Sequence, residues 1–546
     1  MMKARIFRDS RTSLSKETSH MALQNVLIDG KWQASSSKKS FAAENPATQQ
    51  PLADTYPVSS WEDCDRALTA AARAAAELRA LPPERVAVFL ERFAEIIEQR
   101  AAALVDMANS ETGLPKAPRL AEVELPRTSG QLRQAAAAAR EGSWTEPTID
   151  TKANIRSYYA PLGPVWVFGP NNFPFAFNSV AGGDFAAAIA ARNPVIAKAN
   201  TSHPGTTRLL AEAAHDAAQR AELPSGSVQL LYRLEHEDGA RAVADERTGA
   251  VGYTGSRSAG LKLKEAADRA GKPIYLELSS VNPVVMLPGA LRERGDKIAE
   301  EFSGSCLMGA GQFCTNPGLV ILISGDDADR WVQTVTQRFQ SAPVGTLLSK
   351  SVAKNLEASH QKLRAAGAEP LTGGSAGGGT GYSFANTLLR VSGKKFLADP
   401  EACQTEAFGN SSLLVTADSP EQAAQVIDAL EGNLTGTVYS DTAGSDDPLY
   451  QQLAPRLRQR VGRLLNDKMP TGVAVSPAMN HGGPFPATGH PGFTAVGIPA
   501  SIKRFAMLQC FDAVRPERLP HVLRNKNPTG KTWRLIDGAW TQGDVA

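Results

Sequence analysis

The chain is poor in cysteine, and its cysteines lack the spacings that would define a covalent framework. Only five occur in 546 residues, an odd number without a CxxC pair. They are Cys64, Cys306, Cys314, Cys403 and Cys510. This pattern argues against a disulfide scaffold and against a cysteine zinc site, and it favours a reducing, cytoplasmic environment. Cys306 lies in a helix-like run, where a small buried residue is expected.

The chain also lacks an excess of charge and a long apolar run. Its 58 basic and 56 acidic residues leave a net charge of +2, so no nucleic-acid partner is indicated. No apolar run approaches the roughly 18 residues of a membrane span. The basic, serine-rich start has no apolar h-region, and we expect residues 1–23 to be a disordered extension, with Met21 as the working start, in preference to a transit peptide.

Alternating strand and helix patterns dominate the remainder. Apolar runs at residues 165–168, 195–198 and 228–231 flank helical stretches at 181–191 and 206–221. Repeated β-α-β units of this length predict a parallel, doubly wound sheet, with ligands at the carboxyl ends of its strands. A second α/β unit begins after residue 283, and a helix over 294–307 leads to the glycine-rich stretch 309–318. A second glycine-rich run, 373–379, is expected to be a surface loop.

Three stretches carry residues suited to attack on a carbonyl. Cys314 lies between glycines and a proline, Glu277 ends an apolar run, and Asn172 lies in a tight turn before Phe-Pro. A thiolate can add to a carbonyl carbon, a carboxamide can hold the oxyanion, and a carboxylate can activate water. Taken singly, each also fits an ordinary role as a buried thiol, a surface carboxylate or a turn residue.

In this order and context, the three stretches resemble the aldehyde dehydrogenase superfamily from about Leu27 to about Phe511. The resemblance implies an α/β fold with a Rossmann-type coenzyme domain, an α/β catalytic domain and a small β-ribbon that builds a homodimer or homotetramer. The implied boundaries are 24–145 and 163–284 for the coenzyme domain, 285–495 for the catalytic domain, 146–162 and 496–512 for the ribbon, and 513–546 for a C-terminal tail.

The resemblance also implies the roles of the three residues. Cys314 would add to an aldehyde, and its own N–H and the Asn172 amide would hold the oxyanion. Hydride would pass to a nicotinamide coenzyme, and Glu277 would activate the water that hydrolyses the thioester. The alternative from another class is a non-catalytic nucleotide-binding or structural protein on the same fold.

Coenzyme residues follow from the same resemblance. The positions that match the family's coenzyme contacts are Lys198, Thr201, Arg233, Gly255, Ser256, Gly260, Glu406 and Phe408. Thr201 stands where relatives that prefer NAD typically carry a glutamate, and a hydroxyl beside Lys198 and Arg233 does not repel a 2′-phosphate. NADP is therefore favoured, with NAD possible. Asn410 replaces the family's usual proline after the Glu406 motif.

Stretches 169–178, 481–488 and 527–538 look most like the superfamily's 2-oxoglutarate semialdehyde (2,5-dioxopentanoate) dehydrogenases. A substrate with a carboxylate needs a cation in its tunnel, and Arg127 is the candidate, although an exposed helical arginine is an equally open interpretation. Apolar walls are assigned to Phe173, Phe177 and Phe485. The alternative enzyme is an NADP-dependent dehydrogenase of medium-chain or long-chain aliphatic aldehydes, which needs no cation.

Overall fold

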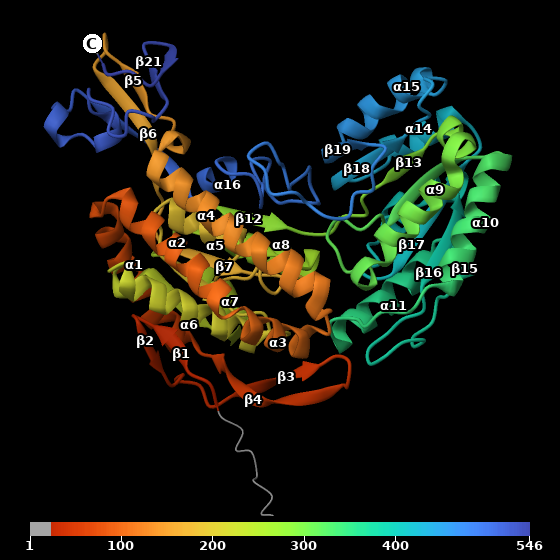
Figure 1. The fold of residues 1–546 in the computed structure, drawn as a ribbon, viewed down its shortest axis with the longest axis horizontal. Coiled ribbons are helices and arrows are strands. Elements are labelled where there is room, and N and C mark those ends of the chain that lie inside the picture. The colour runs from red at the N-terminus through yellow and green to blue at the C-terminus, as the bar shows by residue number, and fades with distance from the viewer. Residues whose placement is uncertain (1–22, 546) are drawn as a thin grey trace, which may run out of the picture.

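The computed structural model describes residues 23–545, so the predicted extension and Met21 lie outside the described residues except for Leu23. Two α/β lobes face each other, and a small sheet projects from the first lobe (Figure 1). Among residues 23–545 no helix is both long and apolar enough to cross a bilayer.

The first lobe is built on a largely parallel sheet with the order β12-β11-β7-β8-β9-β1-β2. Its parallel strands are almost wholly buried, as expected for a sheet covered by helices on both faces. The strands are β7 (Val165–Phe168), β8 (Val195–Lys198), β9 (Val228–Leu231), β11 (Ala250–Thr254) and β12 (Ile274–Glu277), and the hairpin β1 (Val26–Ile28) and β2 (Lys31–Gln33) pairs antiparallel at the edge. The predicted β-α-β alternation is confirmed.

Helices cover both faces of this sheet, and local signals explain several of their ends. The helix α1 begins after Ser60, whose side chain and that of Asp63 form a capping box, and α2 begins at Pro83. The helices are α1 (Trp61–Ala80), α2 (Pro83–Gln99), α3 (Ala101–Thr112), α4 (Leu125–Glu141), α5 (Gly183–Ala190), α6 (Pro204–Arg220), α7 (His236–Ala244) and α8 (Arg257–Arg269). A wider helical segment, Lys116–Glu124, precedes α4, and Pro126 lies in the first turn of α4. A small sheet of β3 (Ser40–Asn45), β4 (Gln50–Ser59) and β10 (Arg233–Leu234) lies beside this lobe.

The second lobe has a sheet with the order β15-β16-β17-β14-β13-β18-β19, parallel except for β15. Its strands are β13 (Val284–Met286), β14 (Leu319–Ile323), β15 (Glu369–Thr372), β16 (Thr387–Ser392), β17 (Ser411–Ala417), β18 (Asn433–Tyr439) and β19 (Val461–Asn466). Its helices are α9 (Pro288–Leu307), α10 (Asp326–Ser341), α11 (Lys350–Ala365), α12 (Gly393–Ala398), α13 (Pro400–Cys403), α14 (Pro420–Asp428) and α15 (Asp447–Arg458). Residues 373–379 lie in the connection between β15 and β16, as predicted, and Cys306 is fully buried in α9.

The projecting sheet has the order β20-β6-β5-β21-β22. The expected ribbon strands β6 (Ile155–Pro161) and β20 (Ala506–Asp512) pair antiparallel, with Ala506 opposite Pro161 and Asp512 opposite Ile155. The prediction of a separate tail at 513–546 is wrong, because β21 (Arg534–Ile536) and β22 (Ala539–Thr541) extend the sheet beside β5 (Thr148–Asp150).

A buried arginine holds this C-terminal segment. The Arg534 guanidinium donates to the carbonyls of Arg524, Asn525 and Gly543 at 2.6, 3.0 and 2.7 Å. The ribbon prediction also begins too early at residue 496. Val496, Ile502 and Phe505 pack into the core of the first lobe, because the short helix α16 (Ala500–Lys503) lies against α5.

The strand register determines where the site lies. Phe168 is opposite Lys198 and Tyr253, and Thr254 is opposite Glu277, so β7, β8, β11 and β12 end at one edge. The residues that follow these strands therefore meet at one edge of the sheet, where a doubly wound fold binds its ligands.

Candidate active site

The turn that carries Cys314 has a backbone that few residues tolerate. After α9, Gly309, Ala310 and Gly311 have φ values of 56°, 55° and 69°. A Cβ on Gly311 would lie 2.0 Å from the carbonyl oxygen of Gly409, so this position requires glycine. Asn282 then fixes the following residues, because its Nδ2 donates to the carbonyl of Cys314 at 2.9 Å.

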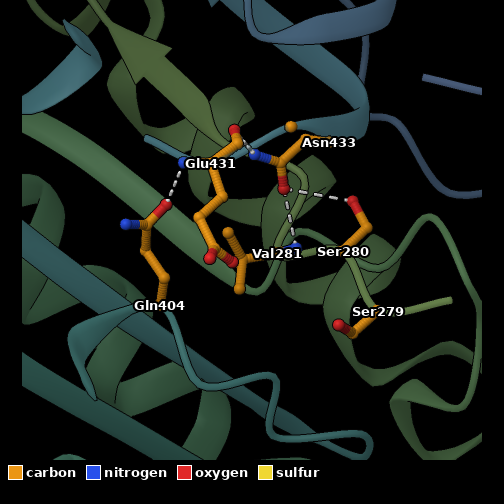
Figure 2. Close-up of a pocket in the computed structure, with 7 residues that line it drawn as sticks. Ser279, Ser280, Val281, Gln404, Glu431 and Asn433 are labelled. Atoms are coloured by element: carbon orange, nitrogen blue, oxygen red, sulfur yellow. Dashed lines mark hydrogen bonds between the residues drawn. The ribbon is translucent and has the colours of Figure 1, made fainter. Parts of the chain in front are cut away.

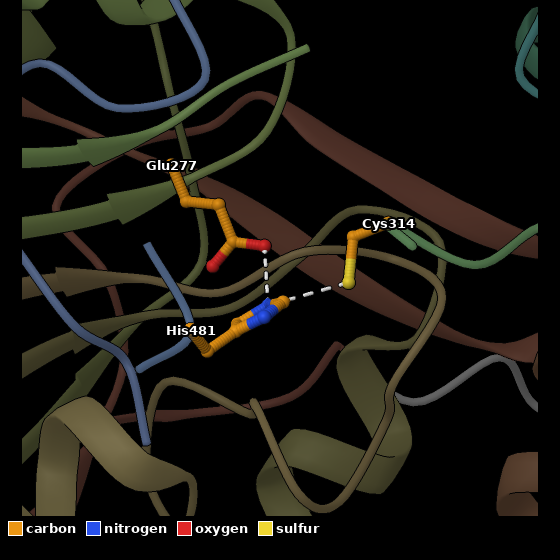
Figure 3. A group of neighbouring side chains, drawn as sticks. All are labelled: Glu277, Cys314 and His481. Carbon is orange, nitrogen blue, oxygen red and sulfur yellow. Dashed lines mark hydrogen bonds and ion pairs between the residues drawn. The ribbon is translucent and has the colours of Figure 1, made fainter. Parts of the chain in front are cut away.

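Glu277, His481 and Cys314 meet in one cluster (Figure 3). The His481 Nε2 lies 2.9 Å from Oε1 of Glu277 and 3.4 Å from Sγ of Cys314. Glu277 is 1% exposed and His481 2% exposed, whereas Cys314 is half-buried. The stretch 481–488, which contains His481, lies against the end of β12, because the Leu278 N–H donates to the carbonyl of Ala487 at 2.8 Å.

Sequence reasoning did not assign His481 a role. It stands in the 481–488 motif that indicated the subgroup, and a single histidine among glycines and prolines was the available signal. Its position between a thiol and a carboxylate is a product of tertiary folding, since it lies 167 residues from Cys314 and 204 from Glu277 along the chain.

The electrostatics of the thiol oppose its ionisation. Burial raises the pKa of Cys314 well above its usual range, and the negative charge of Glu277 adds to this effect. The positive charge of Arg127 acts in the other direction. The thiolate is the group that attacks a carbonyl. His481 Nε2 lies near both the sulfur and Glu277 Oε1, and it can donate its one hydrogen to only one of them at a time.

Asn172 lies beside the Cys314 turn, as its proposed role requires. It is 6% exposed, and its Nδ2 donates to the carbonyl of Gln312 at 3.0 Å. Two residues that sequence reasoning missed hold the surrounding turn. The Nη2 of Arg119 donates to the Asn172 carbonyl at 3.0 Å, and Arg119 pairs with buried Glu124. The Glu124 Oε1 accepts the backbone N–H of Phe175 at 2.8 Å.

A mainly apolar cavity of about 760 Å³ lies between the segment Lys116–Glu124, α4 and the Cys314 turn. Arg127 lines it and is half-buried, with Nη1 donating to the carbonyl of Val473 at 3.0 Å. The Arg127 Nε and Nη2 are buried and have no partner among residues 23–545. The guanidinium lies 5.9 Å from the Phe173 ring and 5.2 Å from the Phe177 ring. A cation with two unpartnered nitrogens therefore belongs to the lining of an apolar cavity near the thiol.

The three predicted wall residues differ in position. Phe173 lines the cavity, and Phe177 lies behind it, 5.8 Å from the His481 ring. The assignment of Phe485 is wrong, because the residue is 57% exposed and does not line the cavity. The carbonyl of Phe485 accepts the N–H of Gly432 at 3.1 Å, which holds this loop against the second lobe. Phe313, which sequence reasoning did not assign, lines the cavity instead.

Comparison with known proteins agrees with this geometry. Residues 32–474 match the model of the aldehyde dehydrogenase family. The chain belongs to this family. It is 39% identical over 530 residues to alpha-ketoglutaric semialdehyde dehydrogenase 2 of Azospirillum brasilense, covering 95% of this chain and 99% of that one. It is 34% identical over 510 residues to alpha-ketoglutaric semialdehyde dehydrogenase of Acinetobacter baylyi, covering 91% and 95%.

The fold agrees with solved structures. The crystal structure of 1-pyrroline-5-carboxylate dehydrogenase from Thermus with bound NAD superposes with a TM-score of 0.78 at 22% identity, covering 93% of this chain and 99% of that one. The predicted fold class, a Rossmann-type coenzyme domain with an α/β catalytic domain, is therefore confirmed.

In this aldehyde dehydrogenase, the expected phosphate-binding residues lie at the sheet edge. Ser256 is the N-cap of α8 and accepts the N–H of Ala259 at 3.4 Å, while Gly255 and Gly260 pack against Tyr253. Lys198 ends β8, which β7 separates from β11, and burial together with the positive charge of Arg233 lowers its pKa to about 8. A helix N-terminus and a lysine at the same edge of the sheet suit the phosphates of a nicotinamide dinucleotide.

The exposed Thr201 lies in the loop after β8, and the exposed Arg233 begins β10, shortly after β9 ends. Neither side chain is a carboxylate, so nothing at these two positions repels a 2′-phosphate.

Glu406 and Phe408 belong to the second lobe, between α13 and β17. They line a small pocket with Ser280, Gly311 and Phe313, next to the Cys314 turn. Burial raises the pKa of Glu406 to about 8. Asn410, in place of the family's proline, donates to the Phe384 carbonyl and to Asn386 Oδ1, both at 2.7 Å.

An adjoining pocket shows how the loop after Glu277 is fixed (Figure 2). The Asn433 Oδ1 accepts Ser280 Oγ at 3.1 Å and the Val281 N–H at 2.9 Å. It also accepts the Asn282 N–H at 3.1 Å. Asn282 in turn holds the Cys314 carbonyl, so one carboxamide of the second lobe connects the loop after the carboxylate to the loop that carries the thiol.

Proposed function

We propose that this aldehyde dehydrogenase oxidises 2-oxoglutarate semialdehyde (2,5-dioxopentanoate) to 2-oxoglutarate, preferentially with NADP and with NAD as a possible alternative. The observation that carries the proposal is Arg127, whose buried Nε and Nη2 have no partner among the described residues and belong to a side chain that lines an apolar cavity. The names of the 39% and 34% identical relatives support the same substrate.

The charge of the substrate explains the requirement for Arg127. A carboxylate that leaves water for an apolar cavity loses hydration, and a guanidinium that offers free N–H donors restores both charge and hydrogen bonds. Arg127 also lies close enough to Cys314 to lower the pKa of the thiol. One side chain can therefore anchor the distal carboxylate and favour the nucleophile.

The residues of the chain account for the remaining chemistry. Cys314 Sγ adds to the aldehyde carbon, and the oxyanion forms beside the Asn172 amide and the Cys314 N–H. A bound nicotinamide coenzyme would supply the hydride acceptor. Cys314 then holds the oxidised carbon as a thioester, and Glu277, with His481 at 2.9 Å, accepts the proton of the water that releases the carboxylate.

The NADP preference rests on the polar residues around Lys198. Thr201 presents a neutral hydroxyl where a carboxylate would repel a 2′-phosphate, and the exposed Arg233 is near enough to Lys198 to lower its pKa. These groups favour a dianionic phosphate. They do not exclude NAD.

A second candidate is the oxidation of medium-chain or long-chain aliphatic aldehydes. The observation that favours it is the size of the cavity, about 760 Å³ with a mainly apolar lining. The same nucleophile and oxyanion site would serve both substrates, and only the distal recognition would differ.

A comparison of substrates and coenzymes tests these alternatives. Purified protein would be assayed for coenzyme reduction with 2,5-dioxopentanoate, succinic semialdehyde and octanal, each with NADP and with NAD. The highest kcat/KM with 2,5-dioxopentanoate and NADP is expected. A preference for octanal would replace the substrate proposal, and no reduction with any aldehyde would favour the non-catalytic alternative.

We also propose that the projecting sheet mediates a homodimer or homotetramer. The strand β20 is at its edge and exposes Met507 and Leu508, at 44% and 59%. An unpaired edge with apolar side chains favours pairing with a second copy. Light scattering of the intact chain and of a Leu508→Lys variant would test this, and an unchanged mass for the variant would contradict it.

A further inference from the structure

The cluster of Glu277, His481 and Cys314 has a second chemical property that aldehyde oxidation does not use. One sulfur, one ring nitrogen and one carboxylate oxygen, each from a different segment, lie within 4.8 Å of one another. Figure 3 shows the carboxylate and the sulfur both directed at the imidazole. Thiolate, imidazole and carboxylate are the three kinds of ligand that Zn²⁺ prefers in proteins.

Two of the three distances between the ligand atoms are close to those of a tetrahedral zinc site, and the third, between Sγ and the carboxylate oxygen, is within 4.8 Å. Zinc–ligand bonds of about 2.3 Å to sulfur and about 2.0–2.1 Å to nitrogen and oxygen place sulfur and nitrogen about 3.6 Å apart, and nitrogen and oxygen about 3.4 Å apart. The observed separations are 3.4 Å for Sγ and Nε2, and 2.9 Å for Nε2 and Oε1. Small side-chain rotations would therefore admit the ion.

A separate observation also indicates a ligand. The second oxygen of Glu277, Oε2, is buried and has no hydrogen-bond partner among residues 23–545. A buried carboxylate oxygen normally has a partner, because losing water without one is costly. A cation bound by both oxygens of the carboxylate would satisfy Oε2 as well as Oε1.

The charges at the site are consistent with a divalent cation. Cys314 as thiolate and Glu277 as carboxylate carry two negative charges in a buried place, and Zn²⁺ would neutralise both. Arg127 is the nearby charge that opposes zinc. Three protein ligands leave a fourth position for water, as in zinc sites that are not purely structural.

We propose that Glu277, His481 and Cys314 form a Zn²⁺ site, and that zinc bound there reversibly inhibits the dehydrogenase by occupying the nucleophile. As the sulfur–zinc bond forms, the thiol proton passes to solvent, and no oxidation or reduction takes place. A chelator that removes the metal restores the free thiol. The inference is independent of which aldehyde the protein oxidises.

The test measures metal binding directly and does not depend on activity. The full chain carrying Cys510→Ser, which removes an exposed thiol, would be freed of metal and titrated with Co²⁺ and then with Zn²⁺. One equivalent of Co²⁺ with a thiolate-to-cobalt absorption band is expected, and Zn²⁺ should displace it. Zinc should also protect Cys314 from alkylation by iodoacetamide, and the chelator should reverse this protection.

Ligand variants identify the site. His481→Asn and Glu277→Gln should each weaken zinc binding at least about tenfold, since even outer partners of a metal site contribute about 10–100-fold. His490→Asn is the matched control, because this exposed histidine packs on Tyr275, 5.0 Å away, outside the cluster. Circular dichroism would verify that each variant folds. If only one of the two ligand variants folds, that variant alone is enough for the comparison. Absence of the band, or a band and affinity unchanged in the folded ligand variants, would overturn the proposal.

Discussion

Arg127→Ala is the substitution that most directly tests how the substrate is recognised. It removes a guanidinium whose Nη1 bonds the Val473 carbonyl at 3.0 Å and whose other nitrogens have no partner among the described residues. Without it, the distal carboxylate of 2,5-dioxopentanoate would be buried without a counter-charge, which costs about 3–5 kcal/mol. At about 1.4 kcal/mol per factor of ten, kcat/KM should fall about 100- to 4,000-fold.

Two comparisons distinguish a loss of substrate recognition from general damage to the protein structure. Octanal has no carboxylate, so Arg127→Ala should change its kcat/KM only a few-fold. Arg133→Ala is the control on the same helix, because Arg133 is exposed and pairs with Glu98 at 2.6 Å, away from the cavity. It should leave both substrates unaffected. Steady-state kinetics with both aldehydes measure this, and an equal loss on octanal and 2,5-dioxopentanoate would refute a carboxylate-binding role.

Three further predictions concern the coenzyme site and the Cys314 turn. Thr201→Glu should raise the KM for NADP at least about tenfold and leave the KM for NAD little changed, because a carboxylate would repel the 2′-phosphate. Steady-state kinetics with both coenzymes test this prediction, and an equal rise in both KM values would contradict it. Lys198 has a pKa lowered to about 8, so it loses its charge as the pH rises through this value. The KM for NADP should therefore rise above about pH 8 in the native protein but not in Lys198→Met, and a pH profile shared by both would refute the assignment. Gly311→Ala should lower the thermal midpoint by several degrees, because its Cβ would lie 2.0 Å from the Gly409 carbonyl oxygen. Gly304→Ala is the control and should not lower it, because Gly304 is exposed and a Cβ there would meet no atom within 4 Å. Equal melting curves for the two variants would show that the turn adapts.

Residues whose role depends on a local motif were predictable from the sequence. Cys314, Glu277 and Asn172 each lie in a short stretch whose glycines, prolines or apolar run define its own backbone, and the structure brings all three to one edge. The buried strands β7 and β8 were predictable for the same reason, since a run of three or four apolar residues bounded by turn residues has few alternatives.

Side-chain direction in loops was not predictable. Phe485 lies in the predicted motif, yet the residue is 57% exposed, because its backbone carbonyl bonds Gly432 and it does not line the cavity. The strands β21 and β22 were missed because each has three residues, too few for a period of two to be recognised.

His481 and Arg119 show why the site is larger than its motifs. Arg119 donates to the backbone carbonyl of Asn172, 53 residues away along the chain. Every residue has a backbone carbonyl, so the residue type at position 172 does not indicate this contact. His481 reaches the thiol and the carboxylate only because β12 and the segment that follows β19 lie side by side. The same juxtaposition that lets one imidazole serve both thiol and carboxylate also assembles three metal ligands. The binding of zinc and the loss of the nucleophile are therefore expected to be two consequences of one geometry.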